Sequence, residues 1–226
     1  MGIDLSNFDL TNFILTMAIL VIAITIHEFA HAITADKLGD PTPRRQGRIS
    51  LLPPDHLEPL GTIMMVLSTF TGMGIGWGKP VQTNPGNFRT PRKDQGIVAI
   101  AGPISNVLQA IIFAAIFQVM ARAGAGDGAM LDFIYIGIRV NLSLAAFNMI
   151  PIYPLDGWWI TQSILPHELS LRYKHWMLTY GSFLFIALIL LERQTGLLGM
   201  IIGPPVHYGS NLLLAGSGWH SKVVLY

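Results

Sequence analysis

The sequence predicts an all-α polytopic membrane protein of about five to six transmembrane helices, with a small re-entrant or β-hairpin region between the first two core helices. Two observations lead to this fold class. Hydrophobic residues make up 51% of the 226 residues and charged residues only 12%, whereas a soluble globular domain carries about 25% charged residues. Several uncharged stretches are also long enough, or nearly so, to cross a bilayer core of about 30 Å.

The N-terminal half contains the clearest membrane spans. An uncharged run from Leu10 to Ile26 predicts a first helix that extends to about Ala35. Residues 97–121 are uncharged throughout and form the strongest predicted span, and residues 129–150 are apolar apart from two charged side chains. Between the first two of these spans, Gly61 to Gly76 is apolar but rich in glycine, which makes it a weaker candidate for crossing.

The C-terminal part predicts further helices over about 173–219. The run from Trp176 to Leu191 is uncharged but short, and residues 195–219 are interrupted by Pro204 and Pro205. We expect this proline pair to kink or break a helix. The sequence shows no internal repeat and no low-complexity linker, so we expect residues 1–226 to form a single domain with its core at about 10–160.

Charge and cysteine content narrow the chemistry. The formal net charge is +1 and there is no cysteine. A basic surface for nucleic acid is therefore not expected. A thiol nucleophile and a zinc site built on sulfur are excluded. Any metal or catalytic site must use histidine, carboxylate, hydroxyl or amide side chains.

A His-Glu-x-x-His pattern lies near the end of the first predicted helix. Residues four apart on a helix share one face, so His27 and His31 can bind one Zn²⁺ together. Glu28 projects beside them and can act as general base towards a metal-bound water. Ionisable groups inside a membrane helix are costly and functional by default, which favours a metal site over a pair of core histidines.

Asp156 is the preferred third ligand. It follows the span at residues 129–150, in a proline-rich stretch that has to unwind the helix. Such unwound backbone occurs in membranes where it is buried in protein or lines a wet cavity. Taken locally, the residue fits an ordinary Asp-Gly turn equally well. The other histidines are His56, His167, His175, His207 and His220, and His56 is the next candidate, although a loop role suits it better.

Topology supports the pairing of Asp156 with the two histidines. The end of the first helix, which carries the two histidines, and the end of the span at 129–150, which precedes Asp156, must lie on the same side of the membrane. This requires an even number of crossings between them. The spans at 97–121 and 129–150 supply two, so residues 61–76 must not cross. Eight of the 14 Lys and Arg residues fall between Lys37 and Lys93, and the positive-inside rule assigns that region to the cytoplasm. The metal then lies towards the cytoplasmic face of the cell membrane.

Several ordered motifs resemble the site-2 protease family of intramembrane zinc metalloproteases, in particular its compact bacterial branch without a PDZ domain. The resemblance runs from about His27 to Gly157. The motifs are His27-Glu28-x-x-His31, Leu38-Gly39-Asp40-Pro41, Gly74-x-Gly76-Trp77-x-Lys79-Pro80, Ala101-Gly102-Pro103-x-x-Asn106, and Asn148-x-x-Pro151-x-x-Pro154-Leu155-Asp156-Gly157.

The resemblance implies a role for each matching position. His27, His31 and Asp156 would be the ligands of one zinc ion per chain, and Glu28 the catalytic acid/base. Asn148 matches an asparagine thought to contact substrate or the developing oxyanion. The remaining matches carry weaker roles: Asn106 a substrate-contact or structural role, and Gly74 and Gly76 a re-entrant β-loop that bears on substrate.

The resemblance also implies the kind of reaction and substrate. We expect a zinc metalloendopeptidase that cuts within or near transmembrane segments of single-pass membrane proteins, such as membrane-tethered transcription regulators or anti-sigma factors. A membrane metal-binding or metal-transport protein using the same ligands is the alternative. A transporter has no need of Glu28 at a general-base position and would be expected to show repeated halves.

Overall fold

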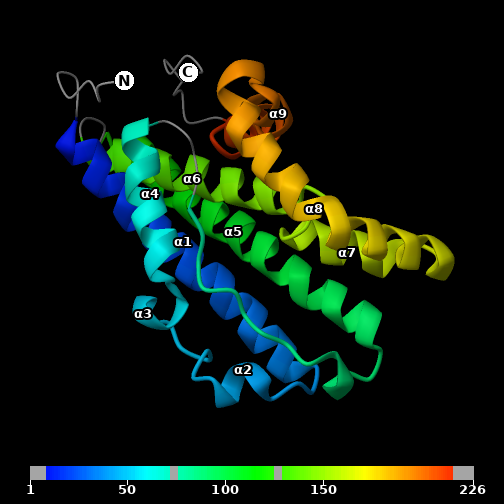
Figure 1. The fold of residues 1–226 in the computed structure, drawn as a ribbon. Helices are drawn as coiled ribbons and strands as arrows, with labels where there is room; N and C mark the ends of the chain where they lie inside the picture. Colours follow the sequence, from blue (N-terminus) through cyan, green and yellow to red (C-terminus); the bar gives the residue numbers. More distant parts are fainter. Residues whose placement is uncertain (1–8, 72–75, 125–128, 216–226) are drawn as a thin grey trace.

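The computed structural model describes residues 9–71, 76–124 and 129–215, and its regular elements are helices (Figure 1). They are α1 Leu10–Lys37, α2 Thr42–Arg45, α3 Pro53–His56, α4 Pro59–Thr71, the 3-10 helix η1 Pro85–Asn87, α5 Pro91–Arg122, α6 Ala129–Asn148, α7 Asp156–Ile164, α8 His167–Thr195 and α9 Leu197–Leu213. The predicted all-α class is confirmed. Within the described residues, four helices (α1, α5, most of α6 and most of α8) are long and apolar enough to cross a membrane. The count of five to six stays a prediction.

Helix α5 is the central element. It packs against α1 on one side and α6 on the other, and it also contacts α7. Its 32 residues give a length of about 48 Å, more than a bilayer core requires. A buried cluster near its C-terminal end, which includes Phe117, Ile134 and Ile138, joins α5 to α6 and α9.

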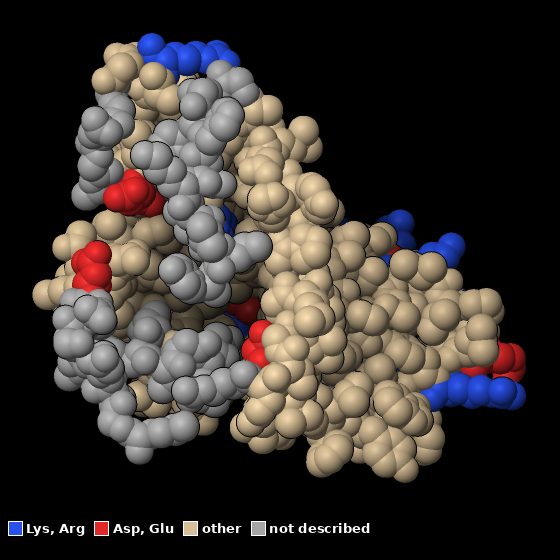
Figure 2. Space-filling view, turned by 90° about the horizontal axis from the view of Figure 1, so that it is seen from above, with Lys and Arg blue, Asp and Glu red and all other residues tan. Residues whose placement is uncertain are grey.

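Many large apolar side chains point outward, as expected for helices that contact lipid. Ile112 and Val119 on α5, Phe183 on α8 and Leu212 on α9 are all more than half exposed. In the view of Figure 2, most of the described surface is neither acidic nor basic, and its charged side chains gather in small separate patches. The apolar composition therefore serves the outside of the bundle as well as its core.

The segment between α1 and α5 returns to the end of α1 at which it began. After α4, residues 76–79 run back past α3 and α4: Gly78 forms an isolated β-bridge with Leu57, and the Lys79 amide donates to the His56 carbonyl at 2.8 Å. The backbone N–H of Asn84 then donates to the carboxylate of Asp40, just beyond α1, at 2.6 Å. The segment thus starts and ends near the same end of α1 (Figure 1), and the expectation that residues 61–76 do not cross the membrane stays a prediction.

The internal structure of this segment differs from a β-hairpin. Its first half is the helix α4, and the isolated bridge is its one β-type pairing among the described residues. A helix satisfies its backbone hydrogen bonds internally, whereas a hairpin edge in an apolar environment does not. The apolar run after Gly61 therefore favours the helix. Gly74 lies outside the described residues.

The C-terminal helices meet at a glycine and not at the proline pair. Helix α8 ends at Thr195, and Gly196 adopts a positive φ of 62° that reverses the chain into α9. Such a left-handed residue is a common way to end a helix. Pro204 and Pro205 lie inside α9, which continues to Leu213. Proline's fixed φ is compatible with a helix, so the pair removes hydrogen bonds without ending it.

Candidate metal centre

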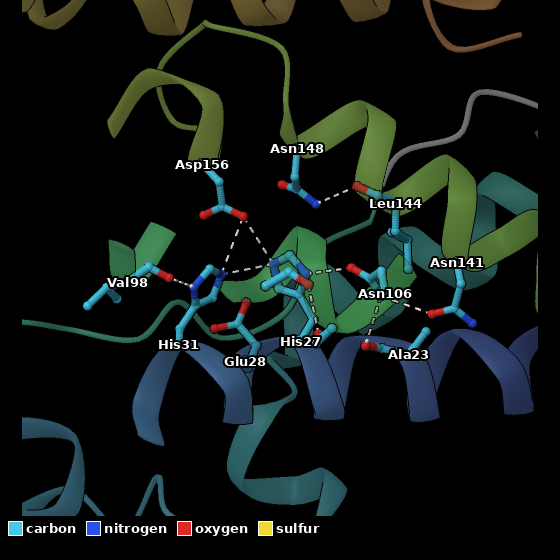
Figure 3. A network of polar contacts seen from close by, with 12 residues as sticks. Ala23, His27, Glu28, His31, Val98, Asn106, Asn141, Leu144, Asn148 and Asp156 are labelled. Atoms are coloured by element: carbon cyan, nitrogen blue, oxygen red, sulfur yellow. Dashed lines mark hydrogen bonds and ion pairs between the residues drawn. The ribbon is translucent and has the colours of Figure 1, made fainter. Parts of the chain in front are cut away.

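His27 and His31 project from one face of α1, one turn apart, towards α5 and α7 (Figure 3). Both are buried, and their Nε2 atoms lie 3.0 Å from each other. The rings are nearly perpendicular, with centroids 4.6 Å apart. The i, i+4 spacing read from the sequence thus aims both ring nitrogens at a common point.

Asp156 reaches the same point from the first position of α7. Helix α6 ends at Asn148, and the proline-containing turn after it carries the chain over the two histidines (Figure 3). The Asp156 Oδ2 atom lies 3.2 Å from His27 Nε2 and 3.3 Å from His31 Nε2. The three residues named as ligands from the sequence are therefore brought together, and they form a group able to hold a metal ion.

The hydrogen bonds of the rings fix which nitrogen faces this point. His31 Nδ1 lies 2.7 Å from the Val98 carbonyl oxygen, and His27 Nδ1 lies 2.6 Å from Asn106 Oδ1. Both partners are acceptors, so each Nδ1 carries the proton. In a neutral imidazole the other nitrogen is then an acceptor. This arrangement, with a ligand histidine donating its second N–H to the protein, is the usual one at metal sites.

These donor atoms fit a zinc ion. Two imidazole lone pairs and a carboxylate oxygen converge, and Asp156 Oδ2 is buried without a hydrogen-bond donor among the described residues. Three acceptors facing one another repel unless a cation lies between them. Ligands about 2.0–2.1 Å from a tetrahedral zinc lie about 3.3 Å from each other, and the observed separations are 3.0–3.3 Å.

Gly102 of α5 makes room for the two imidazoles. A Cβ atom at this position would overlap both His31 Nε2 and His27 Nε2. Pro103 follows it inside the helix and provides no N–H for the Ala99 carbonyl, which weakens hydrogen bonding in the turn that also holds Val98. The Gly-Pro pair of the sequence motif thus lets α5 approach the metal-binding face of α1.

Glu28 lies beside the histidines, and its surroundings come from the segment between α1 and α5. Its Oε2 atom is 3.6 Å from the guanidinium of Arg48, which is only 2% exposed. Arg48 also donates to the carbonyl oxygens of Lys79 and Pro80. A Cβ on Gly78 would lie 3.2 Å from Glu28 Oε1. Gly78 therefore lies close to the Glu28 carboxylate, and the next two residues are tied to its arginine partner.

Burial changes the titration of the basic side chains around Glu28. Burial lowers the pKa of Arg48, and the Glu28 and Asp55 carboxylates oppose that change. Burial likewise lowers the pKa of His56, against a hydrogen bond from its ring to the Ser50 carbonyl at 2.7 Å. His56 lies outside the metal-binding group, and this hydrogen bond fits the loop role that suited it best from the sequence.

Of the residues to which the resemblance assigned weaker roles, one is buried and fully hydrogen-bonded, and the others remain candidates for substrate contact. Asn106 is 0% exposed and both ends of its amide bond within the protein, which favours an orienting role over substrate contact. Asn148 lies above the site at the end of α6, with its amide nitrogen donating to the Leu144 carbonyl at 3.0 Å (Figure 3). Gly76 packs closely against Met65 of α4. Substrate contact by Asn148 and Gly76 stays a prediction.

Two polar residues at the site were not singled out from the sequence. Arg48 was one of eight basic residues that indicated a cytoplasmic segment, but it is buried against Glu28. Asn141 on α6 is 0% exposed and hydrogen-bonded to Asn106. A polar amide in the middle of a membrane helix was the available signal for Asn141, whereas local sequence does not distinguish a buried arginine from an exposed one.

Comparison with known proteins agrees with this geometry. The chain is 35% identical over 195 residues to YwhC of Bacillus subtilis, one of three similar proteins named "Putative zinc metalloprotease", and the match covers 84% of each chain. Residues 119–188 match peptidase family M50. The chain belongs to this family, the site-2 protease family. The enzyme class expected from the sequence, a zinc metalloendopeptidase, is thereby confirmed.

Two further relatives carry the same description. MJ0611 of Methanocaldococcus jannaschii is 39% identical over 72 residues, covering 31% of this chain and 35% of that protein. Rip2 of Mycolicibacterium smegmatis is 28% identical over 137 residues, covering 59% of this chain and 50% of that protein. No solved structure matches the chain. Family membership and the long apolar helices together indicate a multi-pass membrane protein that uses zinc.

Proposed function

We propose that this M50 protein cuts peptide bonds within or near the transmembrane segments of membrane-anchored proteins. His27, His31 and Asp156 hold one Zn²⁺ per chain, and Glu28 is the catalytic acid/base. The observation that supports this most directly is the convergence of three acceptor atoms next to the Glu28 carboxylate, between helices long enough to cross a bilayer.

The reaction divides between the metal and the side chains. Held by His27, His31 and Asp156, zinc would supply the Lewis acidity for attack of water on the scissile carbonyl. Glu28 takes a proton from the attacking water and passes it to the leaving amide nitrogen. Arg48 holds the Glu28 carboxylate through their ion pair. Asn148, at the end of α6, offers an amide to the developing oxyanion.

The substrate binds in an extended form. A helical substrate presents carbonyls that are already hydrogen-bonded, so the scissile region has to unwind before attack. Gly78 lies beside Glu28 and already forms one β-bridge, with Leu57, and the substrate can pair with residues 76–80 as an added strand. Single-pass proteins such as membrane-tethered transcription regulators or anti-sigma factors offer such a segment.

The decisive test is Glu28→Gln in the full chain, reconstituted with a single-pass membrane protein that the wild type cuts. The variant keeps the shape of the side chain but loses the base, so cleavage should fall by about 10²–10⁴-fold while bound zinc is retained. Glu168→Gln, on the exposed first turn of α8, is the matched control and should cleave normally. Near-normal cleavage by Glu28→Gln would end the mechanism.

The same experiment locates the cut. Mass spectrometry of the products should place the hydrolysed bond within or near the transmembrane segment of the substrate. Cuts confined to its soluble domains would contradict the proposed substrate class while leaving the role of Glu28 intact.

We also propose that the protein lies in the cell's cytoplasmic membrane with its active site towards the cytoplasm. The support is the basic segment between Lys37 and Lys93. Because the chain has no cysteine, Arg89→Cys gives a single, exposed labelling site. A membrane-impermeant maleimide should reach it only after the cytoplasmic side is opened. Labelling from outside intact cells would reverse the orientation.

A further inference from the structure

A line of buried amides connects helix α6 to His27 through helix α5 (Figure 3). Asn141 Nδ2 donates to the Gly137 carbonyl at 2.9 Å, and Asn141 Oδ1 accepts from Asn106 Nδ2 at 3.0 Å. Asn106 Oδ1 then lies 2.6 Å from His27 Nδ1. Both asparagines are 0% exposed, so water does not compete for these hydrogen bonds.

The direction of this line is set at its far end. A backbone carbonyl can only accept, so the Asn141 side chain must turn its NH₂ group towards Gly137. Its oxygen then faces Asn106, whose NH₂ group must point back. The Ala23 carbonyl, 3.4 Å from Asn106 Nδ2, favours the same orientation. Reversing either amide would bring two oxygens, or two NH₂ groups, into contact.

Asn106, the last amide of the line, therefore determines the tautomer of His27. With Asn106 Oδ1 facing it, His27 Nδ1 has to carry the proton, and Nε2 keeps the lone pair that faces the metal-binding point. His31 obtains the same tautomer directly from the Val98 carbonyl. Asn141 thus sets the tautomer of His27 through Asn106, as a backbone carbonyl sets that of His31 directly.

We propose that Asn141 is a positioning residue that keeps His27 in the tautomer able to bind the metal, by fixing the orientation of Asn106. This rests on the proposed function, in which His27 is a metal ligand. Asn141 itself has no contact with the reacting groups.

The test is a double-mutant cycle on Zn²⁺ affinity, measured on the purified full chain by competition with a chelator. Loss of a hydrogen-bond partner behind a ligand typically weakens binding by about 10–100-fold. We expect Asn106→Leu to fall in that range and Asn141→Leu near its lower end. In the Asn106→Leu background, Asn141→Leu should change the affinity by less than about twofold, because its effect passes through Asn106.

Two further variants separate orientation from packing. Ile138→Ala removes apolar volume from the same α5–α6 interface, so it should lower thermal stability without changing zinc affinity. Asn141→Asp, as a protonated acid, can still donate to Gly137 and accept from Asn106, and should bind zinc within about threefold of wild type. If Asn141→Leu does not fold, Asn141→Ala takes its place in the cycle.

A spectroscopic measurement provides an independent check. In metal-free protein with ¹⁵N-labelled histidine, the wild-type His27 signal should report the Nδ1–H tautomer, and Asn141→Leu should mix the two tautomers. Additive losses in the cycle, or an unchanged His27 tautomer, would overturn the role of Asn141. Full zinc retention by His27→Ala would instead overturn the ligand assignment on which it rests.

Discussion

The region around the metal-binding group and the helices α8 and α9 differ in burial and in the use of polar side chains. Around the metal-binding group, polar side chains bond from one helix to another, as His27 does with Asn106 and His31 with Val98. In α8 and α9, the hydroxyls of Thr179, Thr195 and Ser210 donate to carbonyls of their own helix, although Gln118 of α5 and Ser170 of α8 do link helices. Half of the most apolar stretch of α5 is buried, against 11% of that of α8.

The metal-binding group requires precise distances, whereas the lipid-facing helices do not. Hydrogen bonds between helices fix distances to a few tenths of an ångström, which a metal site needs. Helices that face lipid on most sides need only length and apolar composition. Matched substitutions should therefore have large effects near the metal-binding group and small ones in α8 and α9.

The largest effect is expected from Asp156→Ala. It removes one of the three converging donors, so Zn²⁺ affinity should fall by more than about 100-fold, beyond the range of residues that only support a ligand. Metal analysis of the purified protein beside wild type measures this. Asp132→Ala, on the exposed side of α6, should keep its zinc. Full zinc in Asp156→Ala would remove this carboxylate from the site.

Next in size is the loss of Arg48. Arg48→Gln leaves Glu28 without its ion-pair partner and should destabilise the protein by about 3 kcal/mol, the cost of breaking a buried pair. Arg44 forms the comparison because its pair with Asp36 is at the surface, with the arginine side chain 61% exposed. Arg44→Gln should have little effect on stability, because solvent screens an exposed pair.

Thermal unfolding in detergent gives both values, and cleavage should fall with the first variant only. Equal losses of stability in the two arginine variants would show that burial of Arg48 adds nothing to its ion pair with Glu28.

A smaller contrast uses glycine. Gly102→Ala forces a methyl group into the two imidazoles and should cost about 1–3 kcal/mol as well as zinc affinity. Gly199 near the start of α9 would place a Cβ only in ordinary van der Waals contact, 3.6 Å from Glu192 Oε1, so Gly199→Ala should stabilise the protein by about 0.5–1 kcal/mol. The same chemical change is thus expected to have opposite signs in the two regions. Two changes of the same sign in thermal unfolding would contradict the contrast.

The smallest effect concerns the hydrogen bonds that join the segment between α1 and α5 to the end of α1. Burial would raise the pKa of Asp40, but hydrogen bonds from Thr42, Asn87 and Asn84 outweigh it and lower the pKa below its ordinary value. A lowered pKa gives stability that is present above the unfolded-state value near pH 3.9 and lost as the pH falls below it. Asp40→Asn should cost about 1 kcal/mol at neutral pH.

The same variant should flatten the loss of stability as the pH falls below about pH 4. Unfolding measured across that range tests this against wild type. An unchanged pH profile in Asp40→Asn would assign the acid sensitivity to other carboxylates.

What could be predicted from the sequence follows the same division. The i, i+4 spacing on a helix fixed the placement of His27 and His31, and an even number of crossings brought Asp156 to the same side. Both arguments are geometric and need no knowledge of packing. The four long spans followed from composition in the same way.

The remaining features depend on contacts between segments distant in the sequence. Burial of Arg48 requires the carbonyls of residues 79 and 80, and the orientation of His27 requires two asparagines on two other helices. Helix α4 forms because a helix satisfies its backbone hydrogen bonds internally in an apolar environment. The glycine-rich composition of this stretch did not predict a helix. The sequence likewise predicted a helix break at Pro204 and Pro205, but the chain reverses at Gly196.

The unequal anchoring of the two imidazoles has a consequence for how such a site changes over generations. His31 bonds to a main-chain oxygen at position 98, which any amino acid supplies, so mutation of that side chain leaves the anchor in place. His27 bonds to a side chain that a single nucleotide change can remove. A substitution at position 106 would therefore release His27, whereas a substitution at position 98 leaves the anchor of His31 in place.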